Sequence, residues 1–409
     1  MNSLNDTHLK KAVIFGAGKM ACGLLGHMLF RSGFKITFVA RRQALIDILN
    51  KKKGYTLYIV GKGVERFAIS NCSAIPVQDE QSVIEAVASS DIVFTAVGVD
   101  SISKISPLIA EAIWRRYKSG ADMPLNVIGS ENLPGVRAYL HHQVLNAVSP
   151  EKAEIVERAG GFSAALTRRI MTGGIMEDGE LIFSGDEDYD LIIDSCGLKG
   201  ELPYLEDVTI TDEFPAMVMR KLFTINCTQA MAAYIGYTKG CRFIHEAAMH
   251  PEVAPLIRKA LAEAQAALKA EFPHHSEAIE KDAAEALSRI ANVKLADTIR
   301  RVAKNPRRKL SSRERLVGAA LLAERHKLPN DNLCIGIAAA LAYDDVEDTH
   351  ALGLRHDISF HGVDKILTED CGLLPYDPLA KRIKGKWNSL VKSSSSHRYG
   401  AAAFNSKEW

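Results

Sequence analysis

The sequence predicts an α/β fold, with an N-terminal domain built on a mostly parallel sheet and a mainly α-helical C-terminal domain. Two observations predict it. In the first part of the chain, short apolar runs that end in glycine or polar residues alternate with helical patterns, as βαβ units do. From Glu213 onward, almost all of the chain has helical periodicity. The 409 residues also exceed one ordinary core, so two or three domains are expected.

The first forty residues predict one βαβ unit. Ala12–Phe15 is a short apolar run of the kind that forms a buried parallel strand. Met20–Arg31 carries apolar residues at helical spacing, and Gly33 stands where a helix commonly ends. Lys35–Val39 is then a second run of β-forming residues.

Further strands are expected at Asp91–Val97 and Leu125–Gly129, with a helix over Ile105–Trp114 between them. The runs Tyr55–Ile59 and Val64–Ile69 predict an additional hairpin. Strands that alternate with helices in this way imply a parallel sheet covered on both faces.

The remainder of the chain predicts a second, helical domain. We expect a first domain over residues 1–200, a helical domain over 201–385, and a flexible tail over 386–409 that contains the serine run Ser393–Ser396. The predicted helices are Pro215–Thr238, Phe243–Phe272, Ser276–Ala291, Ser312–His326 and Leu333–Tyr343.

Composition excludes several classes of partner. The 51 basic and 49 acidic residues leave a formal net charge of +2 and are mixed along the chain, so no surface for nucleic acid or an anionic membrane is predicted. Residues 1–11 lack the apolar run of a signal peptide, and no apolar stretch reaches the roughly 18 residues that span a bilayer. We therefore expect a cytoplasmic protein.

The cysteines predict neither a disulfide framework nor a zinc site. They are scattered, odd in number and contain no CxxC pair, which is typical of reduced thiols in the cytosol. The seven are Cys22, Cys72, Cys196, Cys227, Cys241, Cys334 and Cys371.

A glycine-rich loop joins the first strand to the first helix. Its sequence is Gly16-Ala17-Gly18-Lys19-Met20-Ala21, a GxGxxA pattern. Gly16 permits a tight turn, Gly18 allows the backbone to approach a pyrophosphate, and the small Ala21 allows close packing of strand and helix. The strand before the loop and the helix after it favour a dinucleotide site over a plain structural turn. The N-terminal domain is therefore predicted to be a Rossmann domain.

The end of the second strand predicts which dinucleotide is bound. In an NAD enzyme, an acidic residue about 20 residues past the loop binds the ribose 2′-hydroxyl. Here the strand ends in Phe38-Val39-Ala40-Arg41-Arg42, which has no carboxylate. Paired guanidinium groups suit a 2′-phosphate, so NADP(H) is preferred and NAD(H) remains possible. In the alternative interpretation, Arg41 and Arg42 only begin an exposed helix.

The strand at Asp91–Val97 points to the same site. Its C-terminal end reaches the sheet edge where ligands bind in open α/β folds, which places Val97 and Gly98 near the nicotinamide ribose. A plain buried strand is the alternative, and both interpretations can hold.

The segment Arg220–Gln229 opens the helical run and carries a lysine and two amides. On a helix, Lys221 and Gln229 differ by about 80° and Asn226 and Gln229 by about 60°, so all three can reach one pocket. By spacing alone, an ordinary amphipathic edge is the favoured interpretation.

Lys221–Gln229 resembles the Lys-x4-Asn-x2-His signature of the polyol-specific long-chain dehydrogenases, the mannitol dehydrogenase family. The similarity runs from about residue 11 to about residue 345 and is particularly clear to the mannitol-1-phosphate 5-dehydrogenase branch. The other similar stretches are VIFGAGKMACG, PLNVIGSENLPG around Asn132, GFSAALTRRI at Gly161–Ile170, SRIANVKLADTIRRV at Ser288–Val302, RRKLSSRERL at Arg307–Leu316 and LPNDNLCIGIAAAL at Leu328–Leu341.

The resemblance implies a role for each matching residue. Lys221 matches the general base that removes the alcohol proton while hydride passes to the nicotinamide. Its pKa must then fall by roughly three units, about 4 kcal/mol, through burial in a domain cleft beside the cationic nicotinamide. Asn226 and Asn132 match the amides that donate hydrogen bonds to the developing alkoxide. No metal is implied.

Two positions depart from the family pattern. The family histidine is Gln229 here, which can donate a hydrogen bond to a substrate hydroxyl but cannot carry a proton. Where the mannitol-1-phosphate branch usually has an aspartate, this chain has Ala40 followed by Arg41 and Arg42.

A basic run lies where the family places substrate-binding side chains. Arg308, Lys309 and Arg313 could hold a phosphate or carboxylate of the substrate, although basic residues before a helix are often only solvated. His245 and His250 match no family position and are expected to be surface or packing residues.

These observations predict an NADP-dependent oxidoreductase that acts on a polyol, a polyol phosphate, or a related ketose or sugar acid. A catalytically silent NADP(H)-binding sensor is the alternative, and an opine-like amine or keto acid substrate is a third possibility. We expect a monomer or homodimer.

Overall fold

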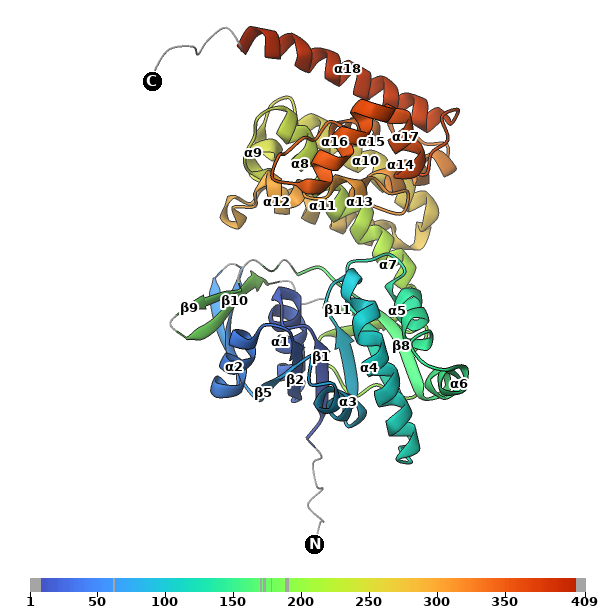
Figure 1. Cartoon of the computed structure of the whole chain (residues 1–409). Helices are drawn as coiled ribbons and strands as arrows, with labels where there is room; N and C mark the ends of the chain where they lie inside the picture. Colours follow the sequence, from blue (N-terminus) through green and yellow to red (C-terminus); the bar gives the residue numbers. More distant parts are fainter. Residues whose placement is uncertain are drawn as a thin grey trace. The chain divides into compact units, whose positions relative to one another are not determined.

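The computed structural model of the protein describes residues 9–61, 63–169, 171, 174–177, 179–187 and 191–401. The chain divides into two compact units, Met1–Pro215 and Ala216–Trp409, drawn in Figure 1. The division lies after the expected residue 200 because strand β12 (Val208–Thr211) still pairs with β11 (Leu191–Asp194) in the sheet of the first unit.

An eight-stranded sheet forms the frame of the first unit, as predicted. Its order is β12-β11-β8-β7-β6-β1-β2-β5, and all neighbours are parallel except β11 and β8. The central strands are apolar on both faces, because helices pack against both sides. The other strands of this sheet are β1 (Lys11–Phe15), β2 (Lys35–Ala40), β5 (Cys72–Pro76), β6 (Ile92–Thr95), β7 (Leu125–Gly129) and β8 (Gly160–Thr167).

A smaller sheet lies beside the helices of the first unit (Figure 1). The predicted hairpin is confirmed: β3 (Tyr55–Val60) pairs antiparallel with β4 (Val64–Ile69). Two further strands of this sheet were not predicted: β3 also pairs in parallel with β10 (Glu180–Asp186), which in turn pairs with β9 (Ile175–Glu177).

The first predicted helix is confirmed, but part of it is wider than an α-helix. A π-helical turn, η1, covers Ala21–Leu25 and continues directly into α1 (Gly26–Arg31). The predicted helix over Ile105–Trp114 lies within the longer α4 (Val99–Lys118). The other helices of this unit are α2 (Gln43–Lys52), α3 (Glu80–Ala88), α5 (Val136–Leu145) and α6 (Pro150–Ala159).

Every regular element in the described part of the second unit is a helix, as predicted. The run expected over Phe243–Phe272 is divided into α9 (Ile244–Met249) and α10 (Ala254–Glu271), because Pro251 cannot continue a helix and His250 before it is extended. The other elements are α7 (Phe214–Lys221), η2 (Leu222–Asn226), α8 (Cys227–Thr238), η3 (Pro273–His275), α11 (Ser276–Ala291), η4 (Val293–Leu295), α12 (Ile299–Ala303), α13 (Pro306–Leu310), α14 (Val317–Arg325), α15 (Asp331–Leu341), α16 (Thr349–His361), α17 (Val363–Glu369) and α18 (Pro378–Ala401).

The segment expected to be a tail begins inside a long helix. Helix α18 includes residues 386–401, and residues 402–409 lie outside the described residues, as do residues 1–8 and Ile170. In the ranges described above, no helix is long and apolar enough to cross a membrane.

Candidate active site

A cavity of about 320 Å³ lies at the carboxyl edge of strands β1, β2 and β6 in the first unit. It brings together six of the residues predicted to bind the cofactor, namely Gly16, Ala17, Gly18, Arg41, Arg42 and Val97. Apart from Ser101 and Lys104, its other lining residues are apolar, among them Leu45, Val77, Ala96 and Ile105. This is the position at which open parallel sheets bind nucleotides.

The glycine loop has the geometry that a pyrophosphate requires. Gly16 has a φ of +103°, and a side chain there would meet the carbonyl oxygen of Ala96 at 2.5 Å, so only glycine fits the turn. A Cβ built on Gly18 meets nothing within 4 Å, which leaves open space above the backbone. Ala21 is fully buried behind the loop. The residues present therefore fit a dinucleotide.

Four predicted cofactor residues do not line this cavity. Lys19 and Met20 follow the glycines along the helix, and Gly98 begins α4 with a φ of +86°. Ala21 packs in the core instead, which is the role expected of a small residue at this position.

The charge of the cavity is positive. Among the described residues that line it, Arg41, Arg42 and Lys104 are basic and none is acidic. Arg42 is also the N-cap residue of α2, so it stands at a helix start, as in the alternative interpretation, and lines the cavity as well. Lys104 was not predicted, because it lies one helical turn after Ser101 on α4 and reaches the cavity only through the packing of α4 in the fold.

Glu131 joins two neighbouring strand ends beside the predicted nicotinamide region. Its carboxylate is buried, with Oε2 accepting from the Thr95 hydroxyl at 2.7 Å and Oε1 accepting from the Val97 N–H at 3.1 Å. These bonds fix the turn that follows β6 and the segment that follows β7. Asn132 is the next residue along the chain and is exposed. The sequence signal for Glu131 is an acidic residue two positions after the buried strand β7.

The second predicted cluster lies on one continuous helical segment of the second unit. Lys221 ends α7, the π-helical turn η2 covers Leu222–Asn226, and Gln229 lies in the first turn of α8. Lys221 and Gln229 are half-buried, and Asn226 is 8% exposed. The prediction assumed one regular α-helix here and was wrong on that point, because η2 changes the angle between these side chains.

An ion pair anchors the segment just before Lys221. The Nε of Arg220 donates to Oδ2 of Asp282 on α11 at 2.8 Å, and both side chains are at least nine-tenths buried. Within the turn, Phe223 packs so closely on α14 that a side chain on Gly318 would lie 3.0 Å from its ring. After the turn, Tyr234 of α8 is fully buried and its hydroxyl donates to the carbonyl oxygen of Ala303 at 2.7 Å, so the backbone on both sides of the turn is held by the core of this unit.

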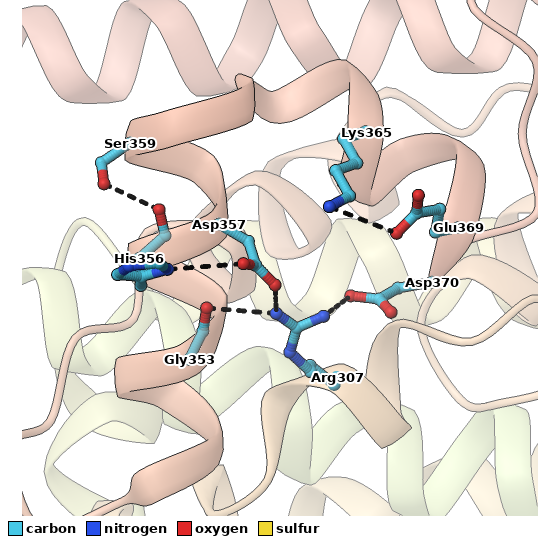
Figure 2. Close-up of polar contacts among 8 residues, drawn as sticks. All are labelled: Arg307, Gly353, His356, Asp357, Ser359, Lys365, Glu369 and Asp370. Atoms are coloured by element: carbon cyan, nitrogen blue, oxygen red, sulfur yellow. Dashed lines mark hydrogen bonds and ion pairs between the residues drawn. The ribbon is translucent and has the colours of Figure 1, made fainter.

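The basic run Arg307–Lys309 is not a uniform surface. Figure 2 shows the Arg307 guanidinium between the carboxylates of Asp357 and Asp370, and its Nη1 lies 2.7 Å from Oδ2 of Asp370. Its Nη2 also donates to the carbonyl oxygen of Gly353 at 3.1 Å. Arg307 therefore ties α13 to α16 and α17.

Lys309 has a different environment from Arg307. It is 3% exposed, and burial together with the nearby charges of Arg315 and Arg308 lowers its pKa to about 7. Its Nζ donates to the carbonyl oxygen of Lys304. Arg308 is exposed as a residue, yet its charge is close enough to contribute to this shift.

Arg315 is a buried cation with spare hydrogen-bonding capacity. It is 6% exposed, and its Nε donates to Oε2 of Glu314 at 3.0 Å. Its Nη2 is fully buried and has no hydrogen-bond partner in the described part of the chain. Of the three residues predicted to bind substrate, Lys309 is buried close to the charges of Arg315 and Arg308. Arg308 and Arg313 are both exposed.

The predicted catalytic residues come from both units. Asn132 lies in the first unit, and Lys221, Asn226 and Gln229 lie in the second. Across the described ranges, no group of three His, Cys, Asp or Glu side chains is arranged to hold a metal ion. His245 stacks on Phe243, which makes it a packing residue as expected. The seven cysteines are all unpaired, and only Cys196 is exposed.

Comparison with known proteins gives the same division. The model of the mannitol dehydrogenase Rossmann domain matches residues 10–206, and that of the mannitol dehydrogenase C-terminal domain matches residues 214–370. The chain is 33% identical over 378 residues to the mannitol-1-phosphate 5-dehydrogenase of Bacillus velezensis, covering 92% of this chain and 99% of that protein. It is also 33% identical over 394 residues to the protein of the same name from Brevibacillus brevis, covering 94% and 100%.

Two solved structures share the fold. The mannitol 2-dehydrogenase of Pseudomonas fluorescens, solved as a ternary complex with NAD and D-mannitol, is 17% identical with a TM-score of 0.70, over 95% of this chain and 92% of that chain. A D-sorbitol dehydrogenase in substrate-free form is 14% identical with a TM-score of 0.73, over 94% and 95%. Together, the two matching family domains and the relatives at 33% identity establish that this chain belongs to the mannitol dehydrogenase family.

Proposed function

We propose that this protein is an NADP-dependent oxidoreductase that transfers hydride between a nicotinamide and a polyol, a polyol phosphate, or a related ketose or sugar acid. The observation that carries the proposal is that Lys221 and Asn226 are retained on one helical segment in a chain that matches both domains of the family. The names of the relatives support a polyol phosphate as the first substrate to test.

The cofactor is proposed to lie in the cavity above the glycine loop. Gly16 and Gly18 leave room for the pyrophosphate, and Arg41 and Arg42, assisted by Lys104, would pair with a 2′-phosphate. The lack of a carboxylate among the described lining residues supports NADP(H) over NAD(H), because no acceptor is offered to a ribose 2′-hydroxyl. The bound nicotinamide supplies the hydride acceptor or donor.

The chemistry of proton transfer is assigned to this chain's own residues. Lys221 would take the alcohol proton as the carbon loses hydride, and would return it in the opposite direction. The amides of Asn226 and Asn132 would donate hydrogen bonds to the alkoxide oxygen that forms in the transition state. Gln229 would hold a substrate hydroxyl without taking part in proton transfer.

The buried cations of the second unit support a substrate with an anionic group. Lys309 and Arg315 are both buried, and Nη2 of Arg315 has no partner among the described residues. A buried guanidinium with an unused donor is costly unless an anion completes its hydrogen bonds. A phosphate or a carboxylate accepts from such a group in the planar geometry it offers.

The test is a spectrophotometric screen of NADPH oxidation against ketoses, ketose phosphates and keto-sugar acids, repeated with Lys221→Ala. We expect turnover with a member of this set, and its loss in Lys221→Ala with NADPH binding retained. Full activity in that variant would remove the proposed mechanism.

Gln229 favours a second candidate function, a catalytically silent NADP(H)-binding sensor. The glutamine replaces the family histidine, whose ring can carry a proton, with an amide that cannot. A screen without any turnover, together with tight binding of NADPH, would select this candidate.

A further inference from the structure

The helical segment that carries the proposed catalytic residues contains a π-helical turn, and its hydrogen bonds define the turn. The N–H of Cys227 donates to the carbonyl oxygen of Leu222, five residues back, instead of four as in an α-helix. At the start of the turn, the hydroxyl of Thr224 donates to the carbonyl oxygen of Arg220 at 2.6 Å. Thr224 is fully buried, so this bond is shielded from water.

The turn changes which side chains share a face. In a regular α-helix, Lys221 and Asn226 would lie about 140° apart, and Lys221 and Gln229 about 80° apart. A π-helical turn has about 4.4 residues, so five steps through it bring Asn226 to about 50° from Lys221. Gln229 then lies within about 10° of Lys221. The three side chains are thereby gathered into one sector of the helix.

Two buried contacts prevent the ends of the segment from rotating to compensate. Before the turn, Arg220 is fixed by its ion pair with Asp282, and after it, Tyr234 of α8 is fixed by its hydrogen bond to the carbonyl oxygen of Ala303. The angle between Lys221 and Asn226 is therefore determined by the backbone between them. Asn226 is 8% exposed, so its side chain is almost fully enclosed by the protein.

The hydroxyl of Thr224 is suited to hold the wide turn. A threonine hydroxyl that bonds the carbonyl four residues back competes with the helical N–H for that carbonyl and opens the helix locally. From the geometry we infer that Thr224 is a positioning residue, which keeps the π-helical turn open so that Lys221 and Asn226 act on the same substrate atom. This inference rests on the proposed function of those two residues.

The molecule supports its other π-helical turn in a comparable way. In η1, the N–H of Gly26 donates to the carbonyl oxygen of Ala21, which leaves the carbonyl of Cys22 without its helical partner. The hydroxyl of Tyr55 donates to that carbonyl at 2.6 Å. In both turns, a buried hydroxyl therefore binds a backbone carbonyl of the widened helix.

The chain offers a matched control for the test. Thr228 lies four residues after Thr224 on the same segment and is 2% exposed, but its hydroxyl has no hydrogen-bond partner among the described residues. Thr224→Val and Thr228→Val therefore make the same chemical change in the same core, and only the first removes a hydrogen bond. Thr224→Ser keeps the hydroxyl and serves as the conservative variant.

We expect Thr224→Val to lower kcat at least tenfold, with KM for NADP(H) changed less than twofold. Thr224→Ser and Thr228→Val should stay within about threefold of the wild-type kcat. With substrate deuterated at the carbinol carbon, the isotope effect on kcat should increase in Thr224→Val, because misplacement of the base slows the chemical step.

Equal kcat values in Thr224→Val and Thr228→Val would overturn the inference, even where both lose stability. If Thr224→Val does not fold, Thr224→Ala replaces it, and a crystal structure of the wild-type protein with NADP(H) gives an independent measurement. A regular α-helix over residues 221–229 in that structure would overturn the inference. If Lys221→Ala retains turnover, both the proposed function and the positioning role of Thr224 are overturned. If Lys221→Ala loses turnover and Thr224→Val keeps the wild-type kcat, only the positioning role is overturned.

Discussion

The hydroxyl of Tyr55 donates a hydrogen bond of 2.6 Å to the carbonyl oxygen of Cys22 and so links the smaller sheet to the helix that follows the glycine loop. Burial raises the pKa of the Tyr55 hydroxyl well above 10, so the group stays protonated and remains a donor. The carbonyl it binds is the one that the π-helical turn η1 leaves without a helical partner.

Tyr55→Phe is therefore expected to lower the free energy of unfolding by about 1–3 kcal/mol, because the Cys22 carbonyl is left buried and unpaired. Urea unfolding of both variants measures this difference. Tyr58→Phe on the same strand is the control, since its hydroxyl bonds to no other described residue. Equal losses in the two variants would contradict the role given to the Tyr55 hydroxyl.

Arg41→Ala combined with Arg42→Ala is expected to raise KM for NADP about tenfold or more and to change KM for NAD much less. The reason is that charge-assisted hydrogen bonds to the 2′-phosphate, about 1.5–3 kcal/mol each, are lost for NADP alone. Initial rates with both cofactors measure the ratio. A parallel rise in both KM values would show that the arginines do not select the cofactor.

Lys309 makes stability depend on pH in a defined window. Its pKa is lowered from 10.5 to about 7 in the folded protein, so between these pH values the unfolded chain holds a proton that the folded chain has lost. Stability contributed by this group therefore rises with pH from about 7 to about 10.5, by at most about 1.4 kcal/mol per pH unit.

Lys309→Met should flatten that dependence, which is measured as the difference in unfolding free energy between pH 7 and pH 9. Lys304→Met is the control, because its side chain is exposed and the carbonyl that binds Lys309 is kept. The same pH dependence in wild type and in Lys309→Met would exclude this group as its source.

Removing one partner of the Arg220–Asp282 ion pair is expected to lower the free energy of unfolding more than replacing both partners with apolar residues. Asp282→Ala should cost about 3–5 kcal/mol, because it leaves a guanidinium buried without its charge partner. Arg220→Met combined with Asp282→Leu should recover a large part of that loss. Thermal and denaturant unfolding test both, and a double variant less stable than Asp282→Ala would contradict the assignment.

Much of the fold could be predicted because it depends on local patterns. Ala12–Phe15 and Leu125–Gly129 are short apolar runs that were predicted as strands, and both form buried strands of the sheet. Pro251, which cannot continue a helix, was a local signal for the break before α10, and the single helix expected over Phe243–Phe272 overlooked it. The glycine loop and the arginine pair, which line one cavity, were predicted as a cofactor site for the same reason. Each is a short motif whose function is set by neighbours in the sequence.

The rest depends on contacts between residues far apart in the chain. Glu131 reaches Thr95, and Tyr55 reaches Cys22, only after the strands have been arranged side by side. Arg307 and Lys309 belong to the same basic run, yet their surroundings differ. Arg307 is held by two carboxylates, whereas Lys309 is buried beside cations. Periodicity also assumes a constant helical twist, which the segment from Lys221 to Gln229 does not have.

The π-helical turn at Leu222–Asn226 accommodates one residue more than an α-helix of the same length. The core contacts before it and those after it therefore follow two different helical phases. A deletion of one residue within the turn would convert the segment into one regular α-helix. The residues on either side of the turn would keep their present contacts in the core. The length of this segment, to the single residue, is thus as much a determinant of the proposed site as the identity of its side chains.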